Sequence, residues 1–153
     1  MLNEGDKAPD FTLLIEDGSQ LTLSDLKGAP LVLYFYPKDD TSGCTTEAID
    51  FTQMLPDFTK LKTRIIGVSP DSVSKHVKFI NKHSLRVTLG ADEDKSVAMD
   101  YGVWAEKKNY GRTYMGIVRT TFLIDKKGHI AKIWNKVRVK DHVAAVLEAA
   151  STL

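Results

Sequence analysis

The sequence predicts an α/β fold in which helices flank a central mixed β-sheet. Short apolar segments with strand composition alternate along the chain with longer segments of helical spacing, which is the pattern of strands connected by helices. One apolar segment, Leu31–Tyr36, shows no polar alternation, which is typical of a strand covered on both faces. The 153 residues are enough for one domain with a sizeable core, and we expect it to cover residues 1–153.

The first half of the chain is expected to form a β-hairpin, a helical turn, a buried strand and a long helix, in that order. Two short strands, Phe11–Ile15 and Gln20–Leu23, surround Asp17-Gly18, a dipeptide typical of hairpin turns. The other three elements are expected at Ser24–Gly28, Leu31–Tyr36 and Cys44–Lys62. Pro56 lies inside the last segment and should kink or split the helix, because proline lacks a backbone donor and its ring clashes with the preceding turn.

Strands and helices continue to alternate through the second half. Apolar runs predict strands at Arg64–Ser69, Val87–Ala91, Ile117–Asp125 and Ile130–Trp134, the last two joined by a turn at Lys126–Gly128. Helices are expected from Asp71 or Ser72 to His83, from the capping residues Asp92–Asp94 to Tyr101, and over Asp141–Ala150. A β-α-β half followed by an antiparallel hairpin and a C-terminal helix is a thioredoxin-like arrangement.

The helix that ends at His83 carries two kinds of residue at helical spacing. Val73, Val77 and Ile80 are placed to form one apolar side. His76 and His83 lie seven residues apart and are expected to face solvent.

Composition and charge exclude several classes of function. The net charge is +1, from 21 basic and 20 acidic residues, which gives no electrostatic argument for binding nucleic acid or an anionic membrane surface. No apolar stretch approaches the roughly 20 residues that span a bilayer, and the start of the chain lacks the pattern of a secretory signal. The single cysteine, Cys44, cannot form an internal disulfide, so we expect a reducing, cytoplasmic location.

Cys44 is the residue with the clearest chemical potential. It is expected at the start of a helix, where a thiol faces unpaired backbone N–H groups and the positive end of the helix dipole. Both favour the thiolate, which is the reactive form. The alternative is a small buried side chain, the usual fate of a free cysteine. The reactive interpretation is favoured because Cys44 follows a polar loop rather than lying in an apolar stripe.

Three other residues are candidates to act with Cys44. Pro37 could shield the thiolate from solvent, and the Thr41 hydroxyl could donate to the sulfur or to a bound oxygen. Alternatively, Pro37 only ends the strand and Thr41 only caps the helix. Arg119 lies in an otherwise apolar segment, where its charge must be paired. Its guanidinium could face Cys44, form a salt bridge with a residue such as Glu47, or do both, because it has five donors.

These residues carry a resemblance to a known family. The spacing Pro37-x-x-x-Thr41-x-x-Cys44 matches the active-site motif of the peroxiredoxins. Segments along nearly the whole chain resemble, in order, the peroxiredoxin Q group, also called bacterioferritin comigratory protein; they are Lys7–Phe11, Phe35–Asp39, Cys44–Ala48, Gly67–Asp71 and Arg119–Asp125. The resemblance implies a thiol peroxidase in which Cys44 is the peroxidatic cysteine and Pro37, Thr41 and Arg119 complete its pocket. It implies no metal and no organic cofactor.

The resemblance also implies a reaction and a set of partners. The Cys44 thiolate attacks hydrogen peroxide or an organic hydroperoxide and becomes a sulfenic acid, while Thr41 and Arg119 stabilise the leaving oxygen. Many members of the group carry a resolving cysteine five residues after the first, where this chain has Ile49. The expected reductant is therefore an external thiol, namely thioredoxin, glutaredoxin or glutathione. A monomer is expected, with a dimer as the alternative.

The main alternative function is that of a redox sensor, which would pass oxidation from Cys44 to a partner with little turnover. A thioredoxin-like disulfide reductase fits less well, because the chain has no C-x-x-C motif.

Overall fold

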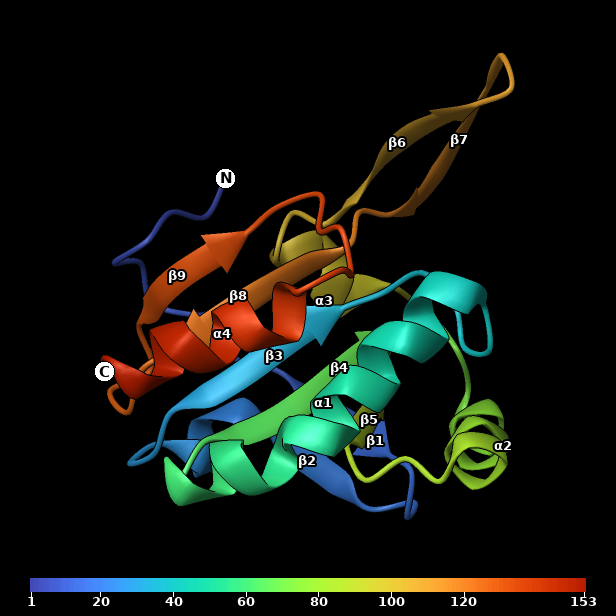
Figure 1. The fold of residues 1–153 in the computed structure, drawn as a ribbon. Helices are drawn as coiled ribbons and strands as arrows, with labels where there is room; N and C mark the ends of the chain where they lie inside the picture. The colour runs from blue at the N-terminus through green and yellow to red at the C-terminus, as the bar shows by residue number, and fades with distance from the viewer.

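The computed structural model describes residues 1–153 and contains the central mixed sheet that the sequence predicts (Figure 1). The sheet has seven strands in the order β2-β1-β5-β4-β3-β8-β9. Strands β3, β4 and β5 run parallel to one another, and the other neighbouring pairs are antiparallel. The strand bounds are β1 Thr12–Ile15, β2 Gln20–Thr22, β3 Leu31–Phe35, β4 Arg64–Ser69, β5 Thr88–Ala91, β8 Thr120–Ile124 and β9 Ile130–Trp134.

Helices cover both faces of this sheet. The helices are α1 Ser42–Lys60, α2 Val73–His83, α3 Ser96–Asp100 and α4 His142–Ser151, and a 3-10 turn, η1, covers Leu23–Leu26. Helices α1, α2 and α4 contribute to one apolar core and α3 to the other, and α1 and α4 lie side by side across the sheet in Figure 1. The central strand β3 serves both cores: Val32 and Tyr34 face the first, and Leu33 and Phe35 face the second. The expectation that this strand is covered on both faces is thus confirmed.

Helix α1 differs from the prediction at its first residue and at Pro56. It begins at Ser42, so Cys44 is its third residue and lies within the first turn. It also continues through Pro56, so of the two expected outcomes, a kink or a split, the split does not occur. Phe51 and Phe58 are fully buried on either side of Pro56. Because tertiary packing anchors the helix before and after the proline, one missing backbone hydrogen bond does not end it.

Helix α2 is turned differently from the predicted orientation. Ser72 caps it as expected, accepting a hydrogen bond from the Lys75 N–H. Its buried residues are His76 and Phe79, whereas Val77 is 38% exposed. The expectation that His76 faces solvent is therefore wrong, because its side chain is 0% exposed. A polar side chain can take this inward position because it finds hydrogen-bond partners there.

A second sheet was not predicted. Strands β6 (Trp104–Asn109) and β7 (Arg112–Ile117) form an antiparallel hairpin that projects from the body of the protein in Figure 1. Tyr110 and Gly111 form its turn with φ of 51° and 75°, and Tyr110 is 97% exposed. Two consecutive left-handed residues are the geometry of a two-residue hairpin turn. The strands carry charged side chains without the apolar alternation of a half-buried strand, so periodicity does not reveal them.

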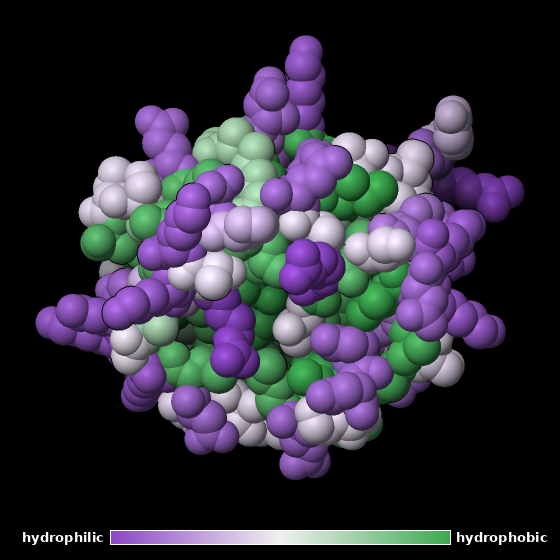
Figure 2. All heavy atoms as spheres, turned by 60° about the horizontal axis from the view of Figure 1, so that its bottom comes forward, coloured by the Kyte–Doolittle hydropathy of each residue, from purple (hydrophilic) through white to green (hydrophobic).

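Figure 2 shows one face of the molecule. In the view of Figure 2, hydrophilic side chains project around the molecule, and hydrophobic atoms show between them rather than as one continuous patch. None of the helices combines the length and the apolar composition that crossing a membrane would require.

Candidate active site

Cys44 occupies the first turn of α1, which follows the carboxyl end of the central strand β3. The first backbone hydrogen bond of the helix runs from the Thr45 N–H to the Thr41 carbonyl. The N–H groups of Ser42, Gly43 and Cys44 therefore precede the hydrogen-bonded part of the helix, as the sequence suggested for the thiol's surroundings. The Cys44 side chain is also 2% exposed and belongs to the apolar core beneath α1. The burial that the sequence analysis argued against is therefore present, together with the expected place at a helix N-terminus.

Arg119 reaches Cys44 from a distant part of the chain. It lies directly before β8, whose first residue, Thr120, pairs with Phe35 at the end of β3. Its Nη2 donates a hydrogen bond to Cys44 Sγ at 3.2 Å, and its Nη1 donates to Glu47 Oε1 at 2.7 Å. Both alternatives drawn from the sequence are therefore present in one side chain. Burial acts to lower the pKa of Arg119, but Glu47 and Cys44 outweigh it and raise that pKa, so the guanidinium stays charged.

Gly43 leaves the space in which this guanidinium lies. A Cβ atom at position 43 would come within 3.2 Å of Arg119 Nη2. Such a distance is tighter than ordinary van der Waals contact, so any side chain at this position would push against the group that contacts the sulfur. The sequence analysis did not single out this glycine, because only the fold brings Arg119 to it.

Glu47 is the buried acid of the site. It lies one helical turn after Cys44 on the same side of α1, and it is fully buried. Burial raises the pKa of Glu47 from 4.5 to about 7, although the charge and hydrogen bond of Arg119 oppose this change. Its second oxygen, Oε2, has no hydrogen-bond partner. Near neutral pH the site therefore holds one fixed cation, Arg119, and one acid, Glu47, that is close to half ionised.

Two further polar side chains border the site without adding charge to it. The Tyr34 hydroxyl is buried with no hydrogen-bond partner, and burial together with the charge of Glu47 raises the pKa of Tyr34 well above its ordinary value. His142, the first residue of α4, has its Nε2 2.8 Å from the Thr121 hydroxyl on β8. Burial, aided by the positive charge of Arg119, lowers the pKa of His142 to about 4. Both groups are therefore neutral at neutral pH.

Pro37 and Thr41 lie in the loop between β3 and α1. Pro37 is half-buried. It follows Tyr36, which lies directly after β3 and whose N–H still donates a hydrogen bond to the backbone of β4. Thr41 stands at the N-cap position of α1, but its side chain makes no capping bond. Its hydroxyl donates instead to the Lys38 carbonyl at 2.9 Å, closing the loop. The structure thus gives Arg119 a direct bond to Cys44, whereas the Thr41 hydroxyl is occupied within its own loop.

Comparisons with known proteins identify the family. The AhpC/TSA family profile matches residues 4–133 of the chain. Peroxiredoxin Bcp of Bacillus subtilis (strain 168) is 54% identical over 144 residues, which cover 94% of this chain and 92% of that protein. This chain is a peroxiredoxin. It belongs to the AhpC/TSA family and to the peroxiredoxin Q, or bacterioferritin comigratory protein, group within it, which confirms the resemblance seen in the sequence.

Solved structures agree with this assignment. Peroxiredoxin Q of Xanthomonas campestris has a TM-score of 0.89 and 42% identity, and the match covers 93% of this chain and 90% of that chain. A cysteine-to-serine mutant of PrxQ from Xylella fastidiosa has a TM-score of 0.94 and 35% identity, over 99% and 97% of the two chains. The fold is therefore the thioredoxin-like peroxiredoxin fold, and the protein is a thiol peroxidase.

The peroxiredoxin site contains residues that sequence reasoning missed. Glu47 was considered only as a salt-bridge partner, although its spacing of three from Cys44 places both residues on one side of a helix. The sequence carried no local signal for Gly43, Tyr34 or His142, because each meets the site through tertiary contacts. No group of three or more His, Cys, Asp or Glu side chains is arranged to hold a metal ion.

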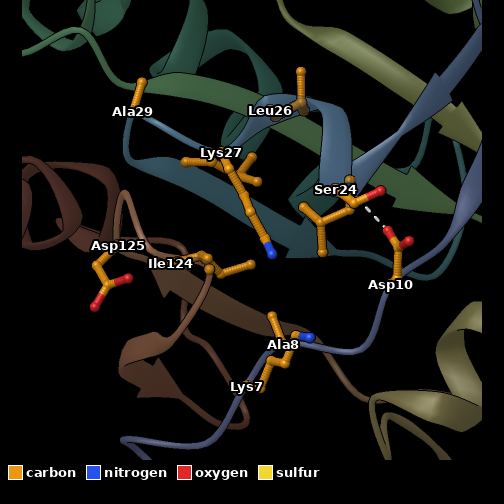
Figure 3. Close-up of a pocket in the computed structure, with 12 residues that line it drawn as sticks. Lys7, Ala8, Asp10, Ser24, Leu26, Lys27, Ala29, Ile124 and Asp125 are labelled. Carbon is orange, nitrogen blue, oxygen red and sulfur yellow. Dashed lines mark hydrogen bonds between the residues drawn. The ribbon is translucent and has the colours of Figure 1, made fainter.

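A separate small cavity is shown in Figure 3. Its lining includes the first residue of β3, whereas Cys44 follows the other end of that strand. The cavity has a volume of about 70 Å³, and its wall includes Leu31 at the start of β3 and Ile124 at the end of β8. Asp10 lies beside it, but this carboxylate accepts a hydrogen bond from the Ser24 N–H and so holds the turn at η1. The cavity therefore has a structural explanation and takes no part in the site around Cys44.

Proposed function

We propose that this peroxiredoxin reduces hydrogen peroxide and organic hydroperoxides through a sulfenic acid formed on Cys44. The observation that carries the proposal is the 3.2 Å hydrogen bond from Arg119 Nη2 to Cys44 Sγ. A fixed cation in contact with a sulfur at a helix N-terminus stabilises the thiolate, and the thiolate is the nucleophile that attacks a peroxide. A report on bacterioferritin comigratory protein from Xanthomonas campestris concerns its alkyl peroxide reduction activity, which supports organic hydroperoxides as substrates here.

The first step is a two-electron oxidation of the sulfur. The thiolate attacks the terminal oxygen of the hydroperoxide, an S–O bond forms, and the O–O bond breaks. The departing oxygen leaves with both bonding electrons and takes up a proton, giving water or an alcohol, and Cys44 becomes a sulfenic acid. Negative charge moves from the sulfur to the departing oxygen during this step. Arg119 is placed to stabilise it throughout, because its two nitrogen atoms are held between Cys44 and the buried Glu47.

Thr41 and Pro37 complete this proposal. The Thr41 hydroxyl would turn from the Lys38 carbonyl, which it contacts at 2.9 Å, and bond to the bound peroxide. Pro37 offers no N–H group to the thiolate and restricts the loop at the point where β3 ends. Their roles in the reaction rest on their position in the loop and on the matching motif.

The second step needs a thiol from another molecule, because Cys44 is the only cysteine in the chain. The external thiolate attacks the sulfenic sulfur and releases water, and a second thiol then breaks the resulting mixed disulfide. Candidate reductants are thioredoxin, glutaredoxin and glutathione, and the cytoplasm is the compartment that keeps them reduced. The resemblance to the peroxiredoxin Q group supports a monomer as the working unit.

The test separates the two half-reactions. We expect reduced protein to lose its thiol rapidly on mixing with hydrogen peroxide or cumene hydroperoxide, and Cys44→Ser to consume no peroxide while keeping its fold. A panel of thioredoxin, glutaredoxin with glutathione, and dithiothreitol then measures turnover. Substantial peroxide consumption by Cys44→Ser would rule out the proposed nucleophile. A wild-type protein that reacts once with peroxide but that none of these reductants returns to its reduced form would instead be a redox sensor.

A further inference from the structure

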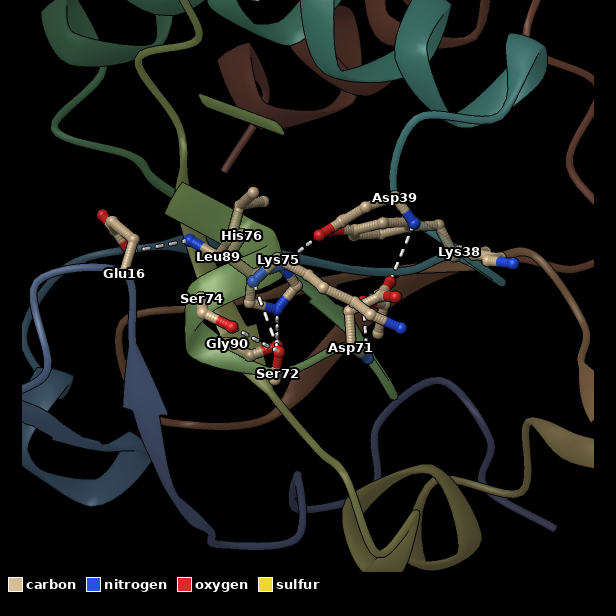
Figure 4. Close-up of polar contacts among 12 residues, drawn as sticks. Glu16, Lys38, Asp39, Asp71, Ser72, Ser74, Lys75, His76, Leu89 and Gly90 are labelled. Carbon is tan, nitrogen blue, oxygen red and sulfur yellow. Dashed lines mark hydrogen bonds and ion pairs between the residues drawn. The ribbon is translucent and has the colours of Figure 1, made fainter. Parts of the chain in front are cut away.

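The loop that carries Pro37 and Thr41 is attached to the rest of the protein by one buried side chain, Asp39. Its Oδ1 accepts a hydrogen bond from the Tyr36 hydroxyl at 2.6 Å, and its backbone N–H donates to Asp71 Oδ2 at 2.8 Å. Its Oδ2 lies 2.7 Å from Nδ1 of His76 on α2. Figure 4 shows His76 and Asp71 converging on Asp39 from the segments that follow β4. Asp39 thus fixes the loop both to the segment after β4 and to α2.

The hydrogen-bond partners of His76 determine its protonation state. Its Nε2 lies 2.9 Å from the Gly90 carbonyl oxygen, which only accepts hydrogen bonds, so Nε2 must carry a hydrogen. Its Nδ1 faces the Asp39 carboxyl, whose other oxygen already accepts from Tyr36. One proton is shared between Nδ1 and Oδ2, and a carboxylic acid is ordinarily a stronger acid than an imidazolium. The hydrogen bond from the Tyr36 hydroxyl further stabilises the ionised carboxylate, so we assign the shared proton to Nδ1. With both nitrogen atoms donating, the ring is an imidazolium.

We propose that His76 is a buried imidazolium whose ion pair with Asp39 holds the loop of Pro37 and Thr41 in place for the reaction at Cys44. His76 is then a positioning residue, because it contacts Asp39 and Gly90 rather than the reacting sulfur. The proposal rests on the peroxidase function proposed for Cys44, but the protonation state of His76 can be measured without peroxide.

The charges around His76 agree with this assignment. Burial acts to lower the pKa of His76, but the hydrogen bond and charge of Asp39 outweigh burial, with smaller contributions from Gly90 and Asp71, and the pKa is raised above 6.5. The titratable groups that face His76 are Asp39 and Tyr36 from the end of β3 and its loop, and Asp71 from the segment before α2. The pKa of Tyr36 is raised well above its ordinary value by burial, so this phenol stays neutral and does not compete for the proton.

Loss of the His76 proton would release the loop. A neutral ring that keeps its hydrogen on Nε2 presents a lone pair at Nδ1, directly towards the buried Asp39 carboxylate. That contact would turn from an ion pair into a repulsion between two acceptors in a region without water. The peroxide reaction should therefore slow as pH rises through the pKa of His76, after the increase that comes from forming the Cys44 thiolate.

The chain supplies a matched control beside this pair. Asp40, the next residue, accepts hydrogen bonds from Lys82 Nζ at 2.7 Å and from His83 Nε2 at 2.9 Å. His83 is on the same helix as His76. The carboxylate of Asp40 is exposed, so solvent reaches this second His–Asp pair. Exposed pairs of this kind contribute little. Substitutions at His83 and Asp40 thus repeat the chemistry of the first pair without its burial.

The first experiment records the ¹⁵N and ¹³C signals of the wild-type histidine rings against pH, without peroxide. We expect both ring nitrogen atoms of His76 to be protonated at neutral pH, with a midpoint above 6.5. A neutral His76 ring at pH 6 would overturn the proposal. This measurement does not depend on the peroxidase activity, and it decides the protonation state of His76 even if every His76 variant fails to fold.

The second experiment measures the second-order rate of Cys44 oxidation by hydrogen peroxide at pH 7 in His76→Gln, Asp39→Asn, His83→Gln and Asp40→Asn. Misplaced reacting groups cost about tenfold or more in rate, so we expect that loss in His76→Gln and less than about a twofold change in the two control variants. In Asp39→Asn the amide NH₂ can donate to Nδ1 of a neutral His76, and its oxygen can still accept from Tyr36. This variant should therefore keep more of the rate than His76→Gln and lose the decline at high pH.

These outcomes separate the two proposals. A folded His76→Gln that reacts as fast as wild type, or an Asp39→Asn that keeps the high-pH decline, would refute the positioning role. A wild-type protein whose Cys44 does not react with peroxide would refute the proposed function, while the ring signals of His76 would still report on the ion pair.

Discussion

Glu47→Gln is the substitution whose effect can be worked out furthest from the structure. Glutamine has nearly the shape of glutamate, and its carbonyl oxygen can keep the hydrogen bond that Arg119 Nη1 makes to Glu47 Oε1 at 2.7 Å. What it removes is the negative charge of a fully buried carboxylate, one oxygen of which has no partner. The variant therefore tests how much free energy the folded protein loses when the carboxyl group of Glu47 ionises.

The magnitude follows from the pKa of Glu47, which burial raises from 4.5 to about 7. Ionisation is harder in the folded state than in the unfolded chain. The contribution of Glu47 to stability is therefore most favourable while Glu47 is protonated in both states, and this contribution falls as pH rises from about 4.5 through about 7. At about 1.36 kcal/mol for each pH unit between the two pKa values, the full penalty above pH 7 is about 3 kcal/mol.

Urea unfolding of wild type and Glu47→Gln at pH 4.5, 6 and 8 measures this penalty. We expect the two proteins to have similar free energies of unfolding at pH 4.5, and the variant to be more stable at pH 8 by up to about 3 kcal/mol. Other groups titrate alike in both proteins and cancel in the difference. Glu148→Gln is the matched control, because Glu148 is exposed on α4, and its difference from wild type should stay near zero at every pH.

Two results would refute this reasoning. If the difference in free energy of unfolding between wild type and Glu47→Gln does not change with pH, Glu47 ionises in the folded protein as easily as in water. A variant that is less stable than wild type at pH 8 would mean that the ion pair with Arg119 outweighs the cost of burying the carboxylate.

Four further predictions concern the site. Arg119→Lys should slow the oxidation of Cys44 by peroxide, measured by stopped flow, by about tenfold or more, because lysine keeps the charge but cannot contact Cys44 and Glu47 through a planar fork; an unchanged rate would make Arg119 a structural residue. Gly43→Ala should slow the same step, because its Cβ would come within 3.2 Å of Arg119 Nη2, and equal rates would show that the guanidinium moves aside without loss. Wild-type protein treated with excess peroxide and no thiol should gain two or three oxygen atoms by intact-mass analysis and lose activity, since no second cysteine protects the sulfenic acid. Ile49→Cys should form an internal disulfide and resist this loss only if the first turns of α1 unwind, because side chains five residues apart on a helix are rotated by about 500°; overoxidation equal to wild type would show that the turns stay closed.

Local sequence patterns were sufficient for much of the fold. The uninterrupted apolar run at Leu31–Tyr36 indicated a strand covered on both faces, and β3 is that strand. The cap expected at Ser72 is present. The N-cap position of α3 falls on Lys95 rather than within Asp92–Asp94, although Asp92 accepts hydrogen bonds from the Val97 and Ala98 N–H groups of that helix. Such features are readable because they depend on residues that are close together in the chain.

Other features were misread because tertiary packing overrides the local preference. Pro56 does not split α1, since the helix is anchored by Phe51 and Phe58 on either side. His76 is buried rather than exposed, since Asp39 and the Gly90 carbonyl satisfy both of its nitrogen atoms. In both cases the cost that the local rule describes is real, but partners far along the chain offset it.

The sequence by itself determined that this protein has one thiol, that it lies near the start of a helix after a buried strand, and that any oxidised form must be reduced by another molecule. Only the tertiary structure decided what surrounds that thiol. Arg119 is 75 residues away from Cys44 and meets it because β8 pairs with the end of β3. The raised pKa values of Glu47 and His76 and the lowered pKa of His142 follow in turn from burial and from partners brought by that packing. The physical reason is that charge and protonation depend on the distances between side chains in space, which residue periodicity along the chain does not contain.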